Sequence, residues 1–180
     1  MATDQLLCGL YCLAFGLGVL GSPATLDDVQ KRLGTVPPTA PGYSLGQMAD
    51  VAQSYGFQTL LVETSVENLR RRPKPFAVIA HVDADMHFLC VIDVDPSGHA
   101  TIFDPLTLSS GRDSVSRVDG PLLTGRWDGV ALLISRAPLL AEEDLPWTTG
   151  MWLRGGLAVV APAIGLAFIV GFVYLRVAKR

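Results

Sequence analysis

Apolar residues open the chain at the spacing of buried and amphipathic helices. Thr25 and Ser44 each stand directly before such a run, as helix-capping residues do, and Gln47 completes a capping box with Ser44. Gly34 and Gly56 follow two of the runs, as helix-ending glycines do. The three helices that this pattern predicts are residues 8–20, 26–33 and 45–55.

After residue 56 the pattern changes to that of strands, with runs rich in β-branched and aromatic residues. The segment Asp95-Pro96-Ser97-Gly98 has the composition of a hairpin turn. The expected strands are residues 57–62, 76–82, 88–94, 100–103 and 130–135, with a short helix at residues 65–70. Helices followed by a mostly antiparallel sheet predict an α+β fold.

The last apolar segment has the length of a membrane span. From Gly155 to Leu175 no residue is charged, and about 20 apolar residues cross a bilayer core. Trp152 and Tyr174 lie near its ends, as interfacial aromatic residues do. We therefore expect a folded domain over residues 1–136, a linker over 137–154, one transmembrane helix over 155–176 and a basic tail over 177–180.

Two orientations of this span are open. The tail with Arg176, Lys179 and Arg180 is the more basic flank, which the positive-inside rule would place in the cytoplasm. In a tail-anchored arrangement, only this short tail crosses the membrane and the domain stays in the cytoplasm. Because residues 1–5 lack the basic side chains of a secretory signal, we expect a single-pass membrane protein whose domain is cytoplasmic.

Charge and cysteine content narrow the classes of function. The formal net charge is -3, whereas a nucleic-acid-binding surface needs a basic stripe. The one basic run, Arg70-Arg71-Arg72-Pro73-Lys74, is interpreted as a solvated helix end. Three cysteines are too few for a secreted disulfide framework, and Cys8 and Cys12 lack two further ligands at zinc spacing. We therefore expect no nucleic acid, no metal and no cofactor.

Three residues in the order Cys, His, Asp carry a candidate chemistry. Cys8 opens the first predicted helix, His87 lies at the start of a strand and Asp104 ends the next strand. A helix N-terminus and a nearby imidazolium activate a thiol, and the histidine needs an acceptor that orients its ring. Because the turn at residues 95–98 lies between them, His87 and Asp104 fall at comparable heights on adjacent strands. Gly9 would leave room for a substrate carbonyl.

The same residue types also have purely structural interpretations. A cysteine in an apolar segment is usually part of the core, as we expect for Cys12 and Cys90. Asp104-Pro105 has the composition of a turn that simply ends a strand. His81 and His99 lie in turn-like surroundings, which predicts exposed imidazoles.

Six short motifs, in this order, resemble those of a known family. They are Cys8-Gly9-Leu10-Tyr11-Cys12-Leu13, Tyr43-Ser44-Leu45 through Tyr55-Gly56-Phe57, Pro75-Phe76-Ala77-Val78-Ile79-Ala80-His81, His87-Phe88-Leu89-Cys90-Val91, Ile102-Phe103-Asp104-Pro105 and Trp127-Asp128-Gly129-Val130-Ala131-Leu132. Over about residues 5–135 the chain is similar to the peptidase domain of bacteriocin and double-glycine-leader ABC exporters, a papain-like cysteine peptidase family. The resemblance implies a papain-like fold, with Cys8 as nucleophile, His87 as general base and then acid, and Asp104 as the residue that orients His87.

The resemblance also implies a substrate, a leader peptide that is cut after a Gly-Gly pair. Such a cleft must be narrow, because only glycine lacks a Cβ that would clash with its walls. The expected function is therefore that of a membrane-anchored cysteine peptidase in bacteriocin-type proteolytic processing. We expect no six-helix membrane domain and no ATP-binding domain in this chain, so a separate exporter is the expected partner.

One position departs from the family pattern. The family usually carries a glutamine six residues before the nucleophile as an oxyanion-hole donor, and that position is Ala2 here. Gln5, three residues before Cys8, is the candidate replacement, and Leu7 stands where the family often has an acidic residue. Two functions stay open: a peptidase that uses Gln5, or a catalytically inactive domain that binds leader peptides or partners at a membrane complex.

Overall fold

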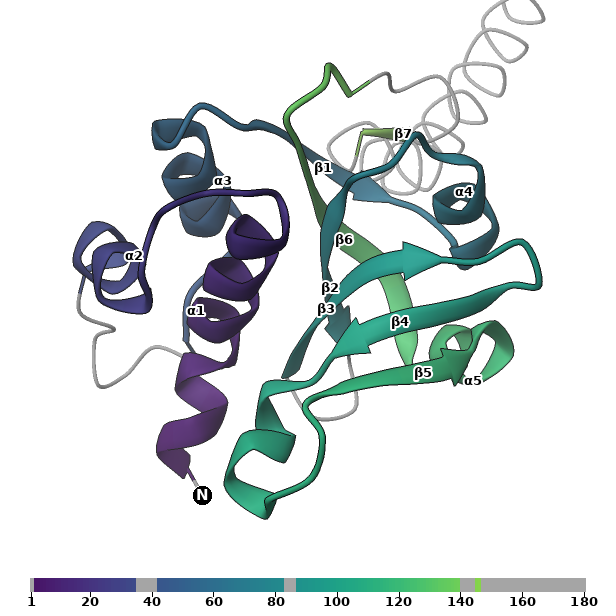
Figure 1. Cartoon of the computed structure of the whole chain (residues 1–180). Helices are drawn as coiled ribbons and strands as arrows, with labels where there is room; N and C mark the ends of the chain where they lie inside the picture. The colour runs from purple at the N-terminus through teal and green to yellow at the C-terminus, as the bar shows by residue number, and fades with distance from the viewer. Residues whose placement is uncertain (1, 35–41, 83–86, 140–144, 147–180) are drawn as a thin grey trace, which may run out of the picture. The chain divides into compact units, whose positions relative to one another are not determined.

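The computed structural model describes residues 2–34, 42–82, 87–139 and 145–146 (Figure 1). The chain divides into two units, Met1–Pro146 and Trp147–Arg180, of which the first is described below. The expected transmembrane helix over residues 155–176 lies outside the described residues. Within the described residues no helix is long and apolar enough to cross a membrane.

Three helices form the N-terminal part of the domain: α1 (Ala2–Val19), α2 (Leu26–Leu33) and α3 (Leu45–Ser54). The two predicted caps are confirmed, since Thr25 and Ser44 both form capping boxes, with Asp28 and Gln47 respectively. The predicted start of the first helix is wrong, because α1 begins at Ala2 rather than near Cys8. No glycine or proline interrupts residues 2–7, so the helix extends upstream of the strongly apolar run.

A seven-stranded antiparallel sheet follows, in the order β5-β4-β3-β2-β6-β1-β7. The strands are β1 (Gln58–Glu63), β2 (Ala77–Val82), β3 (His87–Val94), β4 (His99–Phe103), β5 (Val115–Asp119), β6 (Trp127–Ser135) and β7 (Leu145–Pro146). Two short helices, α4 (Val66–Arg71) and α5 (Gly120–Thr124), and a 3-10 helix, η2 (Pro105–Ser110), complete the domain. The predicted α+β fold is confirmed.

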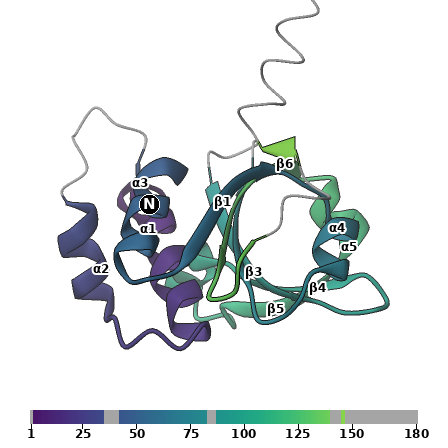
Figure 2. The same ribbon diagram turned by 90° about the horizontal axis from the view of Figure 1, so that it is seen from above.

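The curved sheet separates two hydrophobic cores. Figures 1 and 2 show α1, α2 and α3 on one side of the sheet, and α4 and α5 on the other. Strand β2 serves both cores, because Ala77 and Ile79 face the N-terminal helices while Val78 and Ala80 face the other core. Alternate residues of a strand point to opposite faces, so a fully apolar strand is required at this position.

Four elements that were not predicted lie in the second half of the domain: β5, η2, α5 and β7. β5 pairs with β4, yet four of its five residues are exposed, so it carries no apolar run that would predict a strand. η2 begins at Pro105 directly after Asp104, which caps it. β7 lies within the segment expected to be a linker and pairs with Val62 and Glu63 of β1.

Close packing brings α1 onto β2 and β3. A Cβ atom at Gly16 would lie 3.0 Å from Cβ of Ala77 and 3.3 Å from Sγ of Cys90, so only glycine fits there without a shift. At the end of the helix, Arg136 donates hydrogen bonds to the carbonyl oxygens of Leu20 (2.8 Å) and Gly21 (3.0 Å). These contacts fix the position of α1, and therefore of Cys8, relative to the sheet.

Gly16→Ala should destabilise the domain by about 1–2 kcal/mol, because the added methyl group must push α1 away from Ala77 and Cys90. Gly18→Ala is the matched control, since a Cβ there meets no atom within 4 Å. That substitution should stabilise the domain by about 0.5–1 kcal/mol through helix propensity. Urea unfolding of both variants measures the difference, and equal effects would contradict the packing described here.

Candidate active site

Cys8, His87 and Asp104 are brought together from three elements. Cys8 lies on α1, His87 is the first residue of β3, and Asp104 follows β4 as the N-cap of η2. The β3–β4 register pairs Cys90 with Phe103, which places His87 and Asp104 at the same end of the sheet. Figure 1 shows α1 alongside this end of β3 and β4.

His87 and Asp104 form a hydrogen-bonded pair in which the imidazole is buried and the carboxylate is partly exposed. Nε2 of His87 lies 2.9 Å from Oδ1 of Asp104, and the histidine side chain is only 1% exposed. The same carboxylate oxygen accepts the backbone N–H of Leu106 at 3.0 Å, which fixes its orientation. Asp104 therefore does cap a turn, and it also orients an imidazole. Nδ1, the other ring nitrogen of His87, is buried and makes no hydrogen bond to the described residues.

The charge state of His87 is set by its two neighbours. Burial alone would lower its pKa, but the hydrogen bonds and charges of Asp104 and Cys8 outweigh burial and raise the pKa of His87 to about 9. For Asp104, burial acts in the opposite direction and raises the pKa. The hydrogen bonds from His87 and from the backbone N–H of Leu106 outweigh burial, so the pKa of Asp104 is below its usual value. At neutral pH, His87 is therefore an imidazolium next to the Asp104 carboxylate.

The position of Cys8 within α1 differs from the expectation that it opens a helix. α1 begins at Ala2, so Cys8 is in the second turn, and the field of a helix N-terminus fades within the first turn. The backbone N–H of a residue at this depth is bonded to the carbonyl four residues earlier. The imidazolium of His87, and not the helix end, is therefore the group that can stabilise a thiolate here.

Gly9 has a packing role, and its expected role beside a substrate carbonyl stays a prediction. It is buried, and a Cβ there would lie 3.1 Å from Sδ of Met48 and 3.4 Å from Cδ2 of Phe88. Glycine at this position lets α1 approach α3 and β3 closely. The space that a Cβ would occupy at Gly9 is therefore bordered by the side chains of Met48 and Phe88.

Gln5 lies on α1 three residues before Cys8, a spacing that places two residues on the same side of a helix. Its side chain lies outside what the structure describes, so its oxyanion role stays a prediction. The same holds for Ala2, the position where the family usually has glutamine.

The other two cysteines belong to the core, as expected. Cys12 and Cys90 are fully buried, and none of the three cysteines forms a disulfide. The thiol of Cys12 donates to the carbonyl oxygen of Phe88 at 3.3 Å. Burial raises the pKa of Cys12 well above its usual value and that of Cys90 to about 12.

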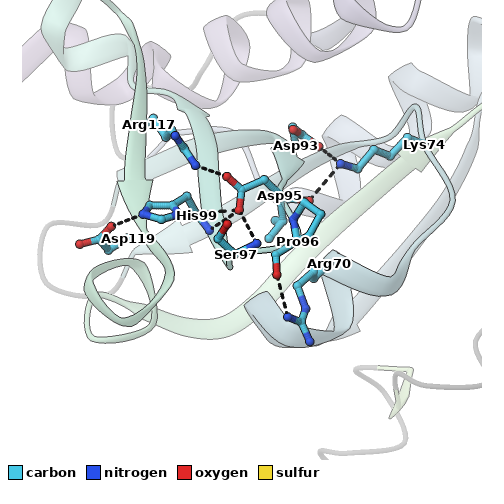
Figure 3. A network of polar contacts seen from close by, with 10 residues as sticks. Arg70, Lys74, Asp93, Asp95, Pro96, Ser97, His99, Arg117 and Asp119 are labelled. Atoms are coloured by element: carbon cyan, nitrogen blue, oxygen red, sulfur yellow. Dashed lines mark hydrogen bonds and ion pairs between the residues drawn. The ribbon is translucent and has the colours of Figure 1, made fainter.

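The two remaining histidines are paired, with side chains that are 28% exposed for His81 and 37% exposed for His99, so His99 is solvent-accessible as expected and His81 is less exposed than expected. Nδ1 of His81 lies 3.2 Å from Oδ2 of Asp128, on the neighbouring strand β6. Nε2 of His99 lies 2.9 Å from Oδ1 of Asp119, in a polar network at the β3–β4 turn (Figure 3). Within the described part of the chain, no group of three His, Cys, Asp or Glu residues could hold a metal ion.

A model of the peptidase C39 family matches residues 1–138. The chain belongs to this family. Its members are cysteine peptidases, and the resemblance to double-glycine leader peptidase domains is thereby confirmed. Among curated proteins, none matches the chain.

Solved structures of C39-type domains share the fold. A double glycine motif protease from an AMS/PCAT transporter, solved in complex with the leader peptide, has 20% identity and a TM-score of 0.56 over 71% of this chain and 82% of that one. The peptidase domain of Streptococcus ComA, a bifunctional ABC transporter, has 17% identity and a TM-score of 0.58 over 76% and 95%. The peptidase domain of Streptococcus mutans ComA has 18% identity and a TM-score of 0.51 over 75% and 94%.

Brief treatment with iodoacetamide at pH 7 should alkylate Cys8 alone. Cys12 and Cys90 should stay unmodified, because burial raises their pKa values and keeps them protonated. Intact-mass and peptide-mass spectrometry of the folded protein identify the site. Modification of Cys12 or Cys90 at a rate similar to that of Cys8 would contradict the site described here.

The His87–Asp104 pair should also make stability depend on pH. The folded pKa of His87, about 9, lies above its usual 6.5. The stabilisation is therefore complete below about pH 6.5 and is lost as the pH rises through 9. In the unmodified protein we expect the free energy of unfolding to fall by about 1–3 kcal/mol over this pH range. Asp104→Asn should lower the pKa of His87 and so remove most of this fall. Urea unfolding under reducing conditions at pH 6.5, 8 and 9.5 tests this, and an equal loss in the variant would contradict it.

Proposed function

We propose that this C39 domain is a cysteine peptidase that cleaves leader peptides after a Gly-Gly pair. The observation that carries the proposal is the Nε2–Oδ1 hydrogen bond of 2.9 Å between His87 and Asp104. The Cys8 side chain is near enough to raise the pKa of the same imidazole. A nucleophile, a base and a group that orients the base are the three roles needed for nucleophilic catalysis. The leader peptide bound to the AMS/PCAT protease supports the choice of substrate.

In the first half of the proposed reaction, the Cys8 thiolate attacks the carbonyl carbon of the second glycine. A C–S bond forms and the carbonyl oxygen becomes an oxyanion. The His87 imidazolium then gives its proton to the leaving amine, the C–N bond breaks, and the C-terminal peptide departs. The leader is left as a thioester on Cys8.

In the second half, neutral His87 takes a proton from water while the water oxygen attacks the thioester carbonyl. The C–S bond breaks, the leader leaves with a free carboxyl end, and Cys8 and His87 regain the thiolate and imidazolium. Asp104 holds Nε2 throughout, so that Nδ1 faces the sulfur and the substrate. A carboxylate in this role stabilises the imidazolium and fixes the ring orientation.

The burial of the reacting groups supports the preference for glycine. Cys8 is 2% exposed and His87 is 1% exposed, so little space surrounds the sulfur. A glycine at the scissile bond would bring no Cβ into this confined space, whereas every other residue would.

Gln5 would supply the oxyanion donor. The N–H of Cys8 lies within the α1 hydrogen-bond ladder, so a side-chain donor is needed, and Gln5 is one helical turn before the sulfur. Residues 155–176 would anchor the domain in a membrane, with the domain in the cytoplasm and a separate exporter as partner.

A catalytically inactive, leader-binding domain is the second candidate. It is favoured by one observation, that Ala2 replaces the usual glutamine of the family. In that case the domain would hold leader peptides or partners at a membrane complex without cutting them.

Residues 1–146 should cleave a fluorogenic Gly-Gly leader peptide, and Cys8→Ala should abolish the cleavage. Cys12→Ala is the matched control, since it removes a thiol one turn away and should keep most activity in the fraction that folds. Gln5→Ala should lower kcat by about 10²–10³ if the amide stabilises the oxyanion, and Thr3→Ala should not.

The alternatives give distinct results in the same assay. A folded domain that binds the Gly-Gly peptide but never cuts it would overturn the peptidase proposal in favour of the leader-binding domain. Cleavage that survives in Cys8→Ala would exclude Cys8 as the nucleophile. Equal cleavage of an Ala-Ala peptide would contradict the proposed specificity.

A further inference from the structure

His81 and Asp128 form a second histidine–carboxylate pair, which the proposed reaction does not use. Nδ1 of His81 lies 3.2 Å from Oδ2 of Asp128, across the neighbouring strands β2 and β6. The two side chains are 28% and 22% exposed. Val82, the residue after His81, is opposite His87 on β3. The pair therefore lies at the same end of the sheet as the candidate active site.

A bulge in β6 holds Asp128 in the orientation that meets His81. The register between β2 and β6 shifts from one side of His81 to the other, so β6 has extra residues at this point. Gly129 has a φ of +89°, a left-handed conformation that glycine adopts without strain. The N–H of Val130 donates to Oδ1 of Asp128 at 2.8 Å, which leaves Oδ2 toward His81. Bulges often re-aim a side chain next to an active site.

The ring of His81 packs against the ring of Phe88, the residue directly opposite on β3. The ring centroids are 5.4 Å apart and the ring planes are inclined by 60°, a geometry that favours aromatic contacts. Phe88 packs against the core beneath the N-terminal helices, and so does Ile79, which shares a face of β2 with His81. His81 therefore supports Phe88 on the side of the sheet that α1 covers.

Phe88 contacts α1 at two residues close to Cys8. Its Cδ2 atom would lie 3.4 Å from a Cβ at Gly9, the residue after the candidate nucleophile. Its carbonyl oxygen accepts a hydrogen bond from the thiol of Cys12, one helical turn after Cys8, at 3.3 Å. Phe88 also follows His87 directly in β3. A displacement of Phe88 would therefore change the position of the thiol relative to the imidazole.

We infer that His81 and Asp128 are positioning residues for the proposed peptidase reaction. Together they hold Phe88 in place, and Phe88 in turn sets how closely Cys8 and His87 approach. This role rests on the proposed function of Cys8 as the nucleophile. Close-packed interiors pass small displacements on to their neighbours, and a misplacement of about 1 Å can lower the rate of a reaction by about 10²-fold.

The rate at which iodoacetamide alkylates Cys8 at pH 7 tests the inference without any peptide. We use residues 1–146, the unit that contains both hydrophobic cores. His81→Ala should lower this rate by about tenfold, because a more distant imidazolium stabilises the thiolate less. Unfolding would have the opposite effect, since it exposes all three thiols, and labelling of Cys12 and Cys90 would reveal it. This readout separates a failure of the inference from a failure of the peptidase proposal.

Cleavage of the Gly-Gly leader peptide supplies a second readout. His81→Ala and Asp128→Ala should each lower kcat by about 10-fold to 10²-fold and leave KM within about twofold, because only the reacting groups are misplaced. A raised KM with an unchanged kcat would overturn the inference. It would instead assign the two partly exposed side chains to a contact with the peptide.

A conservative variant separates positioning from catalysis. Asp128→Asn keeps an oxygen for the N–H of Val130 and offers an amide to His81, so it should retain most of the cleavage and of the Cys8 alkylation. A carboxylate that orients a catalytic histidine does not tolerate this change, which costs about 10⁴-fold in kcat. A loss of that size in Asp128→Asn would overturn the inference in favour of a second catalytic pair.

His99→Ala is the matched control. It removes the other paired histidine, which lies with Asp119 near the β3–β4 turn, at the opposite end of β4 from Asp104 (Figure 3). It should change neither the alkylation rate nor kcat. Equal losses in His99→Ala and His81→Ala would overturn the inference, as would wild-type rates in a folded His81→Ala. If His81→Ala does not fold, His81→Asn keeps a donor for Asp128 without the ring and should show the same lowered Cys8 rate.

Discussion

The close approach of α1 to β2 and β3 is the constraint on which the candidate site depends. Glycines at positions 9 and 16 let the helix backbone come within contact of Met48, Phe88, Ala77 and Cys90. The thiol of Cys12 adds a hydrogen bond to the carbonyl oxygen of Phe88, next to His87. Because protein interiors are close-packed, a helix moved outward by one methyl group would carry Cys8 away from His87.

The second requirement is electrostatic. A histidine as buried as His87 would lose its charge if it had no partners. The Asp104 carboxylate and the Cys8 side chain reverse that tendency and raise the pKa of His87, so the buried imidazole is charged at neutral pH. The carboxylate is in turn held by the N–H of Leu106 at the start of η2. The turn after β4 thus determines the charge state of a side chain on β3.

Much of this arrangement could be predicted from local signals. Capping residues gave the starts of α2 and α3, and the hairpin turn at residues 95–98 put His87 and Asp104 on adjacent strands. These signals are local because a cap or a turn is satisfied within a few residues.

Other features depend on contacts that no local pattern reports. The partners of Gly9 lie about forty and eighty residues away, at Met48 and Phe88, so its packing role was not predicted. β5 places only Val118 against a core, and the pairing of its backbone with β4 makes it a strand. The pairing of His81 with Asp128 likewise required the β2–β6 register. Because α1 begins at Ala2, Cys8 does not lie at the helix end, and His87 is the group that can stabilise its thiolate.

The central claim is that the three residues act together on a peptide bond that follows two glycines. A leader peptide ending in a Gly-Gly chloromethyl ketone tests it most directly, because the thiolate displaces chloride and leaves a stable thioether. We expect one adduct, on Cys8. At neutral pH this adduct should be lost in Asp104→Asn, and an Ala-Ala analogue should form none. A folded protein that forms no adduct, or forms it on Cys12 or Cys90, would contradict the account.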